Sequence, residues 1–122
     1  MSDASIGPVF LVTDRLDELA RFYDRFPLRS TSREPEHHVW YECDGPDLVL
    51  HVPRREPGAN FMPVSRGALI WFGVTEGELT DLAAVWRAEG VRSWGPFEGG
   101  ARTLLYALDP DGNGIGVYAS TD

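Results

Sequence analysis

Apolar positions at the start of the chain follow first a strand pattern and then a helix pattern. Residues 9–13 form an apolar run rich in β-branched side chains, which predicts a strand. The apolar residues that follow recur at helical spacing: Leu16, Leu19, Phe22, Tyr23 and Phe26. We expect Asp14 to cap this helix and Pro27 to end it.

The same order of elements recurs in the second half of the chain. Val12-Thr13-Asp14 matches Val74-Thr75-Glu76, 62 residues further on. Residues 69–74 predict the strand, and the helix after them has an apolar face made by Leu79, Leu82, Val85 and Trp86. Thr75 is the expected N-cap, and Gly90 lies where a helix end favours a left-handed residue.

Each helix is followed by further strand-like runs. In the first half these are 39–43 and 48–52, joined by a turn over 44–47, with a further short strand at 30–33. In the second half they are 91–94, 103–108 and 115–118, with Gly99-Gly100 as a hairpin connection. The pattern therefore predicts a strand, a helix and three strands, twice over.

The segment Asp109-Pro-Asp-Gly-Asn113 reads as a turn before the last strand. Pro110 fixes φ, and Gly112 and Asn113 tolerate the left-handed conformation. The connector between the two halves is rich in proline and carries Phe61 and Met62. These two side chains are expected to cover a ligand groove, to pack against a partner subunit, or to fill the local core.

Composition restricts the class of protein. The 122 residues predict one domain, and the apolar fraction of 43% and charged fraction of 25% are typical of soluble globular proteins. There is no apolar run of about 20 residues, no basic and apolar leader at the start, and a single cysteine, Cys43, so we expect a cytoplasmic protein. The net charge of −8 disfavours nucleic acid as a partner and suits a cationic small molecule, or simply solubility.

These motifs together resemble the vicinal oxygen chelate superfamily, which includes glyoxalases, extradiol dioxygenases and bleomycin resistance proteins. The likeness rests on the closing Asp109–Asn113 motif, on Asp14 with Phe22-Tyr23, and on Glu89-Gly90-Val91. It implies an α+β fold of two βαβββ modules, whose curved mixed sheets enclose a shared cavity within one chain or across a homodimer. Module 1 would span about residues 5–52, the connector 53–66 and module 2 67–120.

The resemblance also implies where a metal would bind in metal-using relatives. The corresponding positions are Gly7, Val49, Leu69 and Gly116, and none of them carries a ligand atom in its side chain. We therefore expect no metal and no cofactor. A different metal site is not expected either. If His37 and His38 lie in a strand, they point to opposite faces, the alternative being a solvated turn after Pro35, and His51 lies in another strand. If a metal were bound, its ligands would be sought among His37, His38, His51 and Glu42.

The remaining candidate chemistry is aromatic. Trp71 shares a strand face with Leu69 and Gly73, and Gly73 and Gly116 leave room beside it. We expect Trp86 in the core; for the other three tryptophans, core and pocket both stay open. The candidate ligand-binding residues are Trp40, Glu42, His51, Phe61, Trp71, Trp94 and Tyr118.

The favoured function is that of a metal-independent protein that sequesters an aromatic or cationic organic ligand without a catalytic residue, by analogy with the bleomycin resistance group. One alternative is an enzyme with His51 or Glu42 as base and Tyr118 or Arg102 stabilising an oxyanion. Another is a glyoxalase-like or dioxygenase-like metalloenzyme with displaced ligands. A third is a structural or regulatory module whose groove its own side chains fill.

Overall fold

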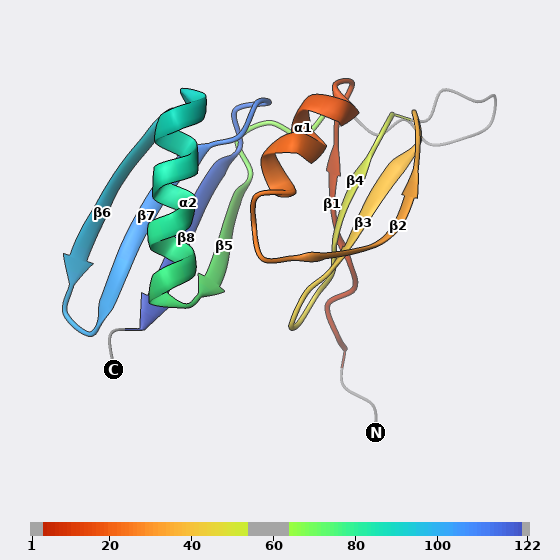
Figure 1. Cartoon of the computed structure of the whole chain (residues 1–122). Coiled ribbons are helices and arrows are strands. Elements are labelled where there is room, and N and C mark those ends of the chain that lie inside the picture. The colour runs from red at the N-terminus through yellow and green to blue at the C-terminus, as the bar shows by residue number, and fades with distance from the viewer. Residues whose placement is uncertain (1–3, 54–63, 121–122) are drawn as a thin grey trace. The chain divides into compact units, whose positions relative to one another are not determined.

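The computed structural model describes residues 4–53 and 64–120. These residues form two compact units, each with one helix and one four-stranded sheet (Figure 1). The first unit contains β1 to β4 with α1, and the second contains β5 to β8 with α2 and the short segment Arg25–Pro27. No helix among the described residues has the length and apolar character needed to cross a membrane.

The first unit is a βαβββ module. Its elements are β1 (Val9–Val12), α1 (Leu16–Tyr23), β2 (Arg29–Glu34), β3 (His38–Glu42) and β4 (Leu48–His51). The strand order is β1-β4-β3-β2, in which β1 runs parallel to β4 and the other neighbours are antiparallel. Parallel strands need a long connection, and here α1, β2 and β3 lie between β1 and β4 along the chain.

The second unit repeats this topology. Its elements are β5 (Leu69–Val74), α2 (Glu76–Glu89), β6 (Ser93–Gly99), β7 (Arg102–Leu108) and β8 (Gly114–Ser120). The strand order is β5-β8-β7-β6, with β5 parallel to β8. The predicted α+β fold with two βαβββ modules is therefore confirmed.

In each unit the helix covers one face of the sheet (Figure 1). Side chains alternate between the two faces of a strand, so every second residue points toward the helix. In the second unit these are Leu105 and Ala107 of β7 and Ile115, Val117 and Ala119 of β8, all of them buried. The helix side is thus the core of each unit, and the other side, here named the open face, is available for other uses.

The first helix differs from its prediction at both ends. Its N-cap is Arg15 rather than Asp14, and the nearby side-chain acceptor is Thr13, whose Oγ1 accepts from the Arg15 N–H at 2.9 Å. The helix ends at Tyr23, so Phe26 does not extend its apolar face. Phe26 instead packs in the second unit, with its ring centroid 4.4 Å from that of Phe72, because the chain leaves the first unit after Asp24.

The second helix matches its prediction closely. Thr75 is the N-cap and forms a capping box, in which its side chain accepts from the Glu78 N–H and the Glu78 carboxylate accepts from the Thr75 N–H. Gly90 ends the helix in the left-handed conformation, with φ of 72°. Trp86 is fully buried, as expected. The strand predicted at 91–94 begins later, at Ser93, and continues to Gly99.

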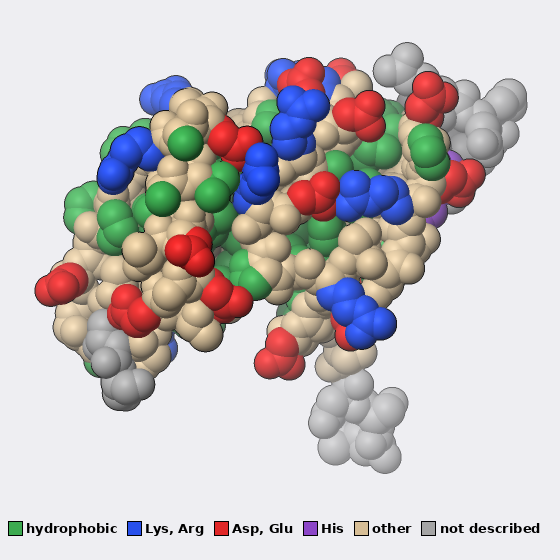
Figure 2. All heavy atoms as spheres, in the orientation of Figure 1, with side chains coloured by type: hydrophobic (Ala, Val, Ile, Leu, Met, Phe, Trp, Pro, Cys, Tyr) green, Lys and Arg blue, Asp and Glu red, His purple; other side chains and the backbone are tan. Residues whose placement is uncertain are grey.

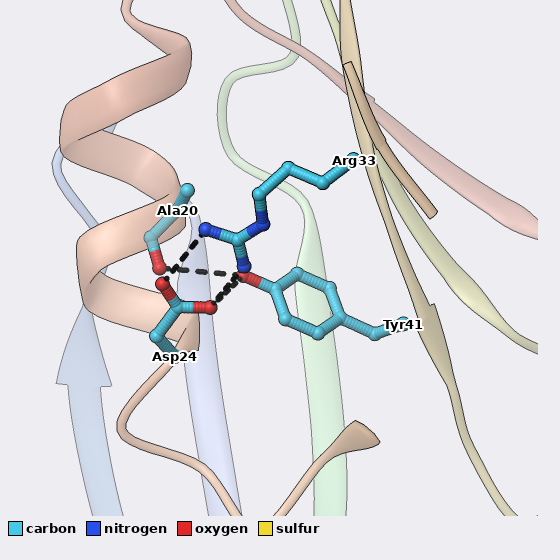
Figure 3. A network of polar contacts seen from close by, with 4 residues as sticks. All are labelled: Ala20, Asp24, Arg33 and Tyr41. Carbon is cyan, nitrogen blue, oxygen red and sulfur yellow. Dashed lines mark hydrogen bonds and ion pairs between the residues drawn. The ribbon is translucent and has the colours of Figure 1, made fainter. Parts of the chain in front are cut away.

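A polar network fastens the end of α1 to its sheet (Figure 3). The Tyr41 hydroxyl donates to Asp24 Oδ1 at 2.7 Å, and the Arg33 guanidinium donates to both oxygens of the same carboxylate. Burial, reinforced by the hydrogen bond to Asp24, holds the pKa of Tyr41 well above its usual value. Tyr41 therefore remains a neutral donor, and the network has a structural role on the helix side of the sheet.

The Asp109–Asn113 motif forms a second polar network, which is buried. The Asp109 carboxylate accepts from the backbone N–H of Asp111, the backbone N–H of Asn113 and the Asn113 side-chain amide, at 2.9 to 3.0 Å. The Asn113 Oδ1 in turn accepts from the Ala68 N–H, just before β5. Of the two residues expected to suit a left-handed conformation, only Gly112 adopts it, with φ of 86°. Asn113 is needed for its amide, which links the turn before β8 to the start of β5.

Replacement of Asn113 by alanine should reduce the free energy of unfolding by about 3 kcal/mol, because it leaves the Asp109 carboxylate and the Ala68 N–H short of buried partners. Denaturant unfolding measures this change. Asn113→Asp keeps the acceptor for the Ala68 N–H but places a second carboxylate beside Asp109. The decrease in its free energy of unfolding should therefore be greatest at neutral pH and become smaller on acidification. Equal losses for both variants at every pH would contradict this description of the network.

Candidate functional site

The predicted ligand-binding residues lie on the open faces of both sheets. Strand alternation places Trp71 of β5, Trp94 of β6 and Tyr118 of β8 on the open face of the second unit. Trp40 and Glu42 of β3 lie on the open face of the first unit, as does His51 of β4. Phe61 lies outside the described residues.

Aromatic rings gather at the centre of the open face of the second unit. The Trp71 ring meets the Tyr106 ring edge to face, with centroids 5.5 Å apart, and the Tyr118 ring lies 6.5 Å away. Phe97 continues the group at 6.3 Å from Tyr106. Trp71 is 46% exposed, whereas Trp86 on the helix side is fully buried. The group of Trp71, Tyr106, Tyr118 and Phe97 is named the aromatic platform below.

Two glycines support this platform. A Cβ atom on Gly116 would lie 2.5 Å from the Trp71 ring, and one on Gly73 would lie 2.8 Å from the Tyr118 hydroxyl. The two rings therefore lie directly on the backbone of the neighbouring strand. The expectation that these glycines leave open room beside Trp71 is thus wrong: the protein's own rings occupy that room, and the space for a ligand lies above the rings.

Arginine side chains already lie over two of these aromatic residues. The Arg102 guanidinium carbon is 5.1 Å from the centre of the Tyr118 ring, and that of Arg92 is 5.7 Å from the Trp94 ring. Arg102 thus places a positive charge at the edge of the aromatic platform, on a chain whose net charge is −8.

Sequence reasoning missed part of the platform. Tyr106 alternates with the buried residues of β7, so its position on the open face was readable from strand periodicity once β7 was identified. Phe97 gave no such signal, because the strand predicted at 91–94 stopped short of it.

The open face of the first unit combines aromatic and polar groups. The Phe10 ring lies 6.2 Å from Trp40 and 6.0 Å from His51. The Trp40 indole N–H donates to Asp47 Oδ2 at 2.9 Å, and this hydrogen bond lowers the pKa of that carboxyl. Cys43 is half-buried, and burial raises the pKa of its thiol, which disfavours a reactive thiolate.

The positions that carry metal ligands in metal-using relatives do not suit a metal here. Val49 is buried between Phe10 and Trp40 in its row of the sheet. Leu69 offers no donor atom, and the Trp71 ring fills the place of a side chain at Gly116. Gly7 has no side chain either. The donor set therefore does not fit a metal ion at these positions.

The histidines, in contrast, depart from their predicted separation. His37 lies in the turn before β3 rather than in the strand, and its Nδ1 is 2.7 Å from that of His38. The ring of His51 lies 4.7 Å from that of His37. Opposite faces were expected only for a strand that contains both residues. His37 lies instead in the turn that follows Pro35, which was the alternative, and the turn lets its side chain point back toward His38.

Comparisons with known proteins agree on the fold. No protein-family model matches the sequence, and no curated protein matches it significantly. Among solved structures, a lactoylglutathione lyase from Agrobacterium tumefaciens is similar over 99% of this chain and 97% of its own, with 22% identity and a TM-score of 0.71. A glyoxalase/bleomycin resistance protein from Albidiferax ferrireducens is similar over 93% of this chain and 97% of its own, with 19% identity and a TM-score of 0.72.

An oxidase is similar as well, over 97% of this chain and 96% of its own, with 18% identity and a TM-score of 0.70. The chain thus has the glyoxalase/bleomycin resistance fold, as its motifs indicated. This fold carries a lyase, a resistance protein and an oxidase among these structures, so the site and not the fold has to decide the function.

Replacement of Gly116 by alanine should displace the Trp71 ring and reduce the free energy of unfolding by about 1 to 3 kcal/mol, because the new methyl group overlaps the ring. Gly114→Ala on the same strand is the matched control, since its Cβ would lie 3.3 Å from the flexible end of Leu69. Denaturant unfolding compares the two variants. A Gly116→Ala protein as stable as the control would show that Trp71 does not pack on this backbone.

Proposed function

We propose that the protein binds a small aromatic organic molecule, which stacks on the aromatic platform and is held without chemical change. The observation that carries this proposal is the Trp71 ring, seated on Gly116 and flanked by Tyr106, with nearly half of its surface exposed. A rigid, half-exposed indole presents a flat face to a ligand and loses little conformational entropy on binding.

The exposure of the platform distinguishes it from ordinary core. Leu69, Phe97 and Trp71 are 65%, 51% and 46% exposed, and all belong to the open face of one sheet. Contiguous apolar surface of this kind marks binding sites in soluble proteins, because leaving it in water has no structural benefit. Stacking of a planar molecule would remove this surface from water and add the favourable geometry of paired rings.

Local charge refines the class of ligand. Arg102 lies over Tyr118 and offers donors to an acidic oxygen at the edge of the platform. This position favours an aromatic ligand that bears a carboxylate or a similar anionic group. The alternative is the cationic aromatic ligand favoured by the net charge of −8 and by Glu42 on the open face of the first unit.

Binding by stacking needs no metal at the positions used by metal-dependent relatives. It also needs no catalytic residue, so the protein would act by sequestering or carrying its ligand. The Albidiferax ferrireducens neighbour, whose name is glyoxalase/bleomycin resistance protein, has the same fold, and this likeness supports the proposed role.

Trp71→Ala should weaken binding of a planar aromatic probe by at least about fivefold, since a lost aromatic stack is worth about 1 kcal/mol or more. Calorimetric titrations with anilinonaphthalenesulfonate, which is anionic, and proflavine, which is cationic, would measure this. The matched control is Trp94→Ala, because Trp94 is 45% exposed, nearly as much as Trp71, but its ring lies against the Arg92 guanidinium and not on the backbone of a glycine.

The proposal fails if Trp71→Ala and Trp94→Ala weaken binding equally, because the probes would then adhere to any exposed ring. It also fails if Trp71→Ala mainly lowers the free energy of unfolding and leaves affinity unchanged. Stronger binding of the anionic probe, lost in Arg102→Gln, would support the anionic class, and stronger binding of the cationic probe would support the alternative.

We also propose that the protein is a cytoplasmic homodimer. Leu69 and Phe97 are exposed apolar side chains on the open face of the second unit. A second copy of the chain that covers part of this face would remove their surface from water, which favours a dimer. Sedimentation over a range of concentrations should give twice the monomer mass of 13.6 kDa. A monomer at every concentration would contradict the homodimer.

A further inference from the structure

The open face of the first unit ends in a polar cluster at the β2–β3 turn. β2 ends at Glu34, and β3 begins at His38. The turn between them is closed by a hydrogen bond from the His37 N–H to the Glu34 carbonyl at 3.0 Å, and Glu36 within it has a φ of 61°. Figure 2 shows histidine beside acidic side chains at this edge of the unit.

Strand register places several of these side chains in one row. Glu34 pairs with His38 across β2 and β3, and His38 pairs with His51 across β3 and β4. Side chains paired in this way share a face and lie about 5 Å apart at Cβ. The turn adds His37, whose Nδ1 lies 2.7 Å from the Nδ1 of His38 and 3.8 Å from Glu34 Oε2.

We propose that Glu34, His37 and His38 form a binding site for a divalent transition-metal ion, with zinc as the expected ion. One ligand atom from each of the three lies within 4.8 Å of the other two. Imidazole nitrogen and carboxylate oxygen are donors that zinc prefers, at about 2.0 to 2.2 Å from the ion. Two donors at tetrahedral positions around zinc lie about 3.3 Å apart. The separations from His37 Nδ1 to His38 Nδ1, 2.7 Å, and to Glu34 Oε2, 3.8 Å, each lie close to that value.

Neighbouring groups orient the imidazole rings for this role. The Nε2 atom of His38 lies 2.8 Å from Ser32 Oγ, so this hydrogen bond holds the ring and leaves Nδ1 turned toward His37. His51 packs its ring 4.7 Å from that of His37, and its own Nδ1 is bonded to the Val52 carbonyl at 2.6 Å. The His51 ring therefore packs against the His37 ring, and Ser32 is a positioning residue that holds the His38 ring.

The site is separate from the positions that the superfamily resemblance implied. Those positions are Gly7, Val49, Leu69 and Gly116, whereas the proposed ligands belong to the β2–β3 turn and the strand ends beside it. Three protein ligands leave a coordination position for water or a small ligand atom. The net charge of −8 favours cation binding in general, and Glu36 adds a carboxylate to the same turn.

The test is zinc binding by the full chain after removal of metal with a chelator. Competition against a chromophoric chelator should show one equivalent of zinc bound with a Kd of about a micromolar or tighter. Cobalt in place of zinc should give the intense visible absorption of a four- or five-coordinate ion. His37→Ala and His38→Ala should each weaken zinc binding by at least about a hundredfold, and Ser32→Ala by about tenfold.

Glu42→Gln is the matched control: the sequence also offered Glu42 as a metal ligand, but the structure places it on the same face of β3 as His38 at the opposite end of the strand, away from the proposed site. It should bind zinc as the wild type does. His37 and Glu34 are partly exposed, so variants there should fold, and circular dichroism verifies this.

Less than about a tenth of an equivalent of zinc would overturn the proposal. Unchanged affinity in His37→Ala and His38→Ala would also overturn it, as would equal loss in Glu42→Gln. The proposal would also be overturned by weak zinc binding that is unchanged in Glu34→Gln and by cobalt spectra typical of an octahedral ion only. Such results would indicate adventitious binding to surface histidines. The aromatic probes test a different unit of the chain, so either proposal can fail while the other holds.

Discussion

A four-stranded sheet that packs against one helix leaves its second face uncovered by its own module. Both units of this protein have that construction, and strand alternation therefore divides every strand between a core face and an open face. The core face has to be apolar and close-packed. The open face is free of that demand, so the residues that differ most in chemistry between the two units lie there.

On the second unit, the open face is shaped by the contact between the Trp71 ring and the backbone of Gly116. The contact requires the absence of a side chain at position 116, which is also the position where the superfamily resemblance places a metal ligand. The same glycine therefore offers no ligand atom and provides the backbone on which the indole ring lies.

The first unit uses the same topology for a different purpose. Its sheet brings carboxylate and imidazole groups into one row at the end of β2, β3 and β4, and a single turn adds the third ligand of the proposed metal site. The two modules therefore carry different side chains on the face that packing leaves unconstrained, while the polar networks at Asp24 and Asp109 stabilise each module.

The sequence by itself determined the features that depend on neighbouring residues. Strand alternation, Thr75 as an N-cap, the left-handed Gly90 and the repeated order of elements all arise from local periodicity and backbone preference, and all were predicted. The two-module fold was implied by the resemblance that rests on these local signals and on the closing Asp109–Asn113 motif.

Tertiary structure alone decided the features that depend on residues distant in sequence or on turn geometry. Phe26 lies beyond the end of α1 and packs against Phe72 within the second unit, a contact that its helical spacing did not indicate. His37 and His38 met because a turn residue does not obey strand alternation. The role of Gly116 depends on the Trp71 ring, which lies over it from the neighbouring parallel strand. These two residues are far apart in the chain, so local preference cannot specify their contact.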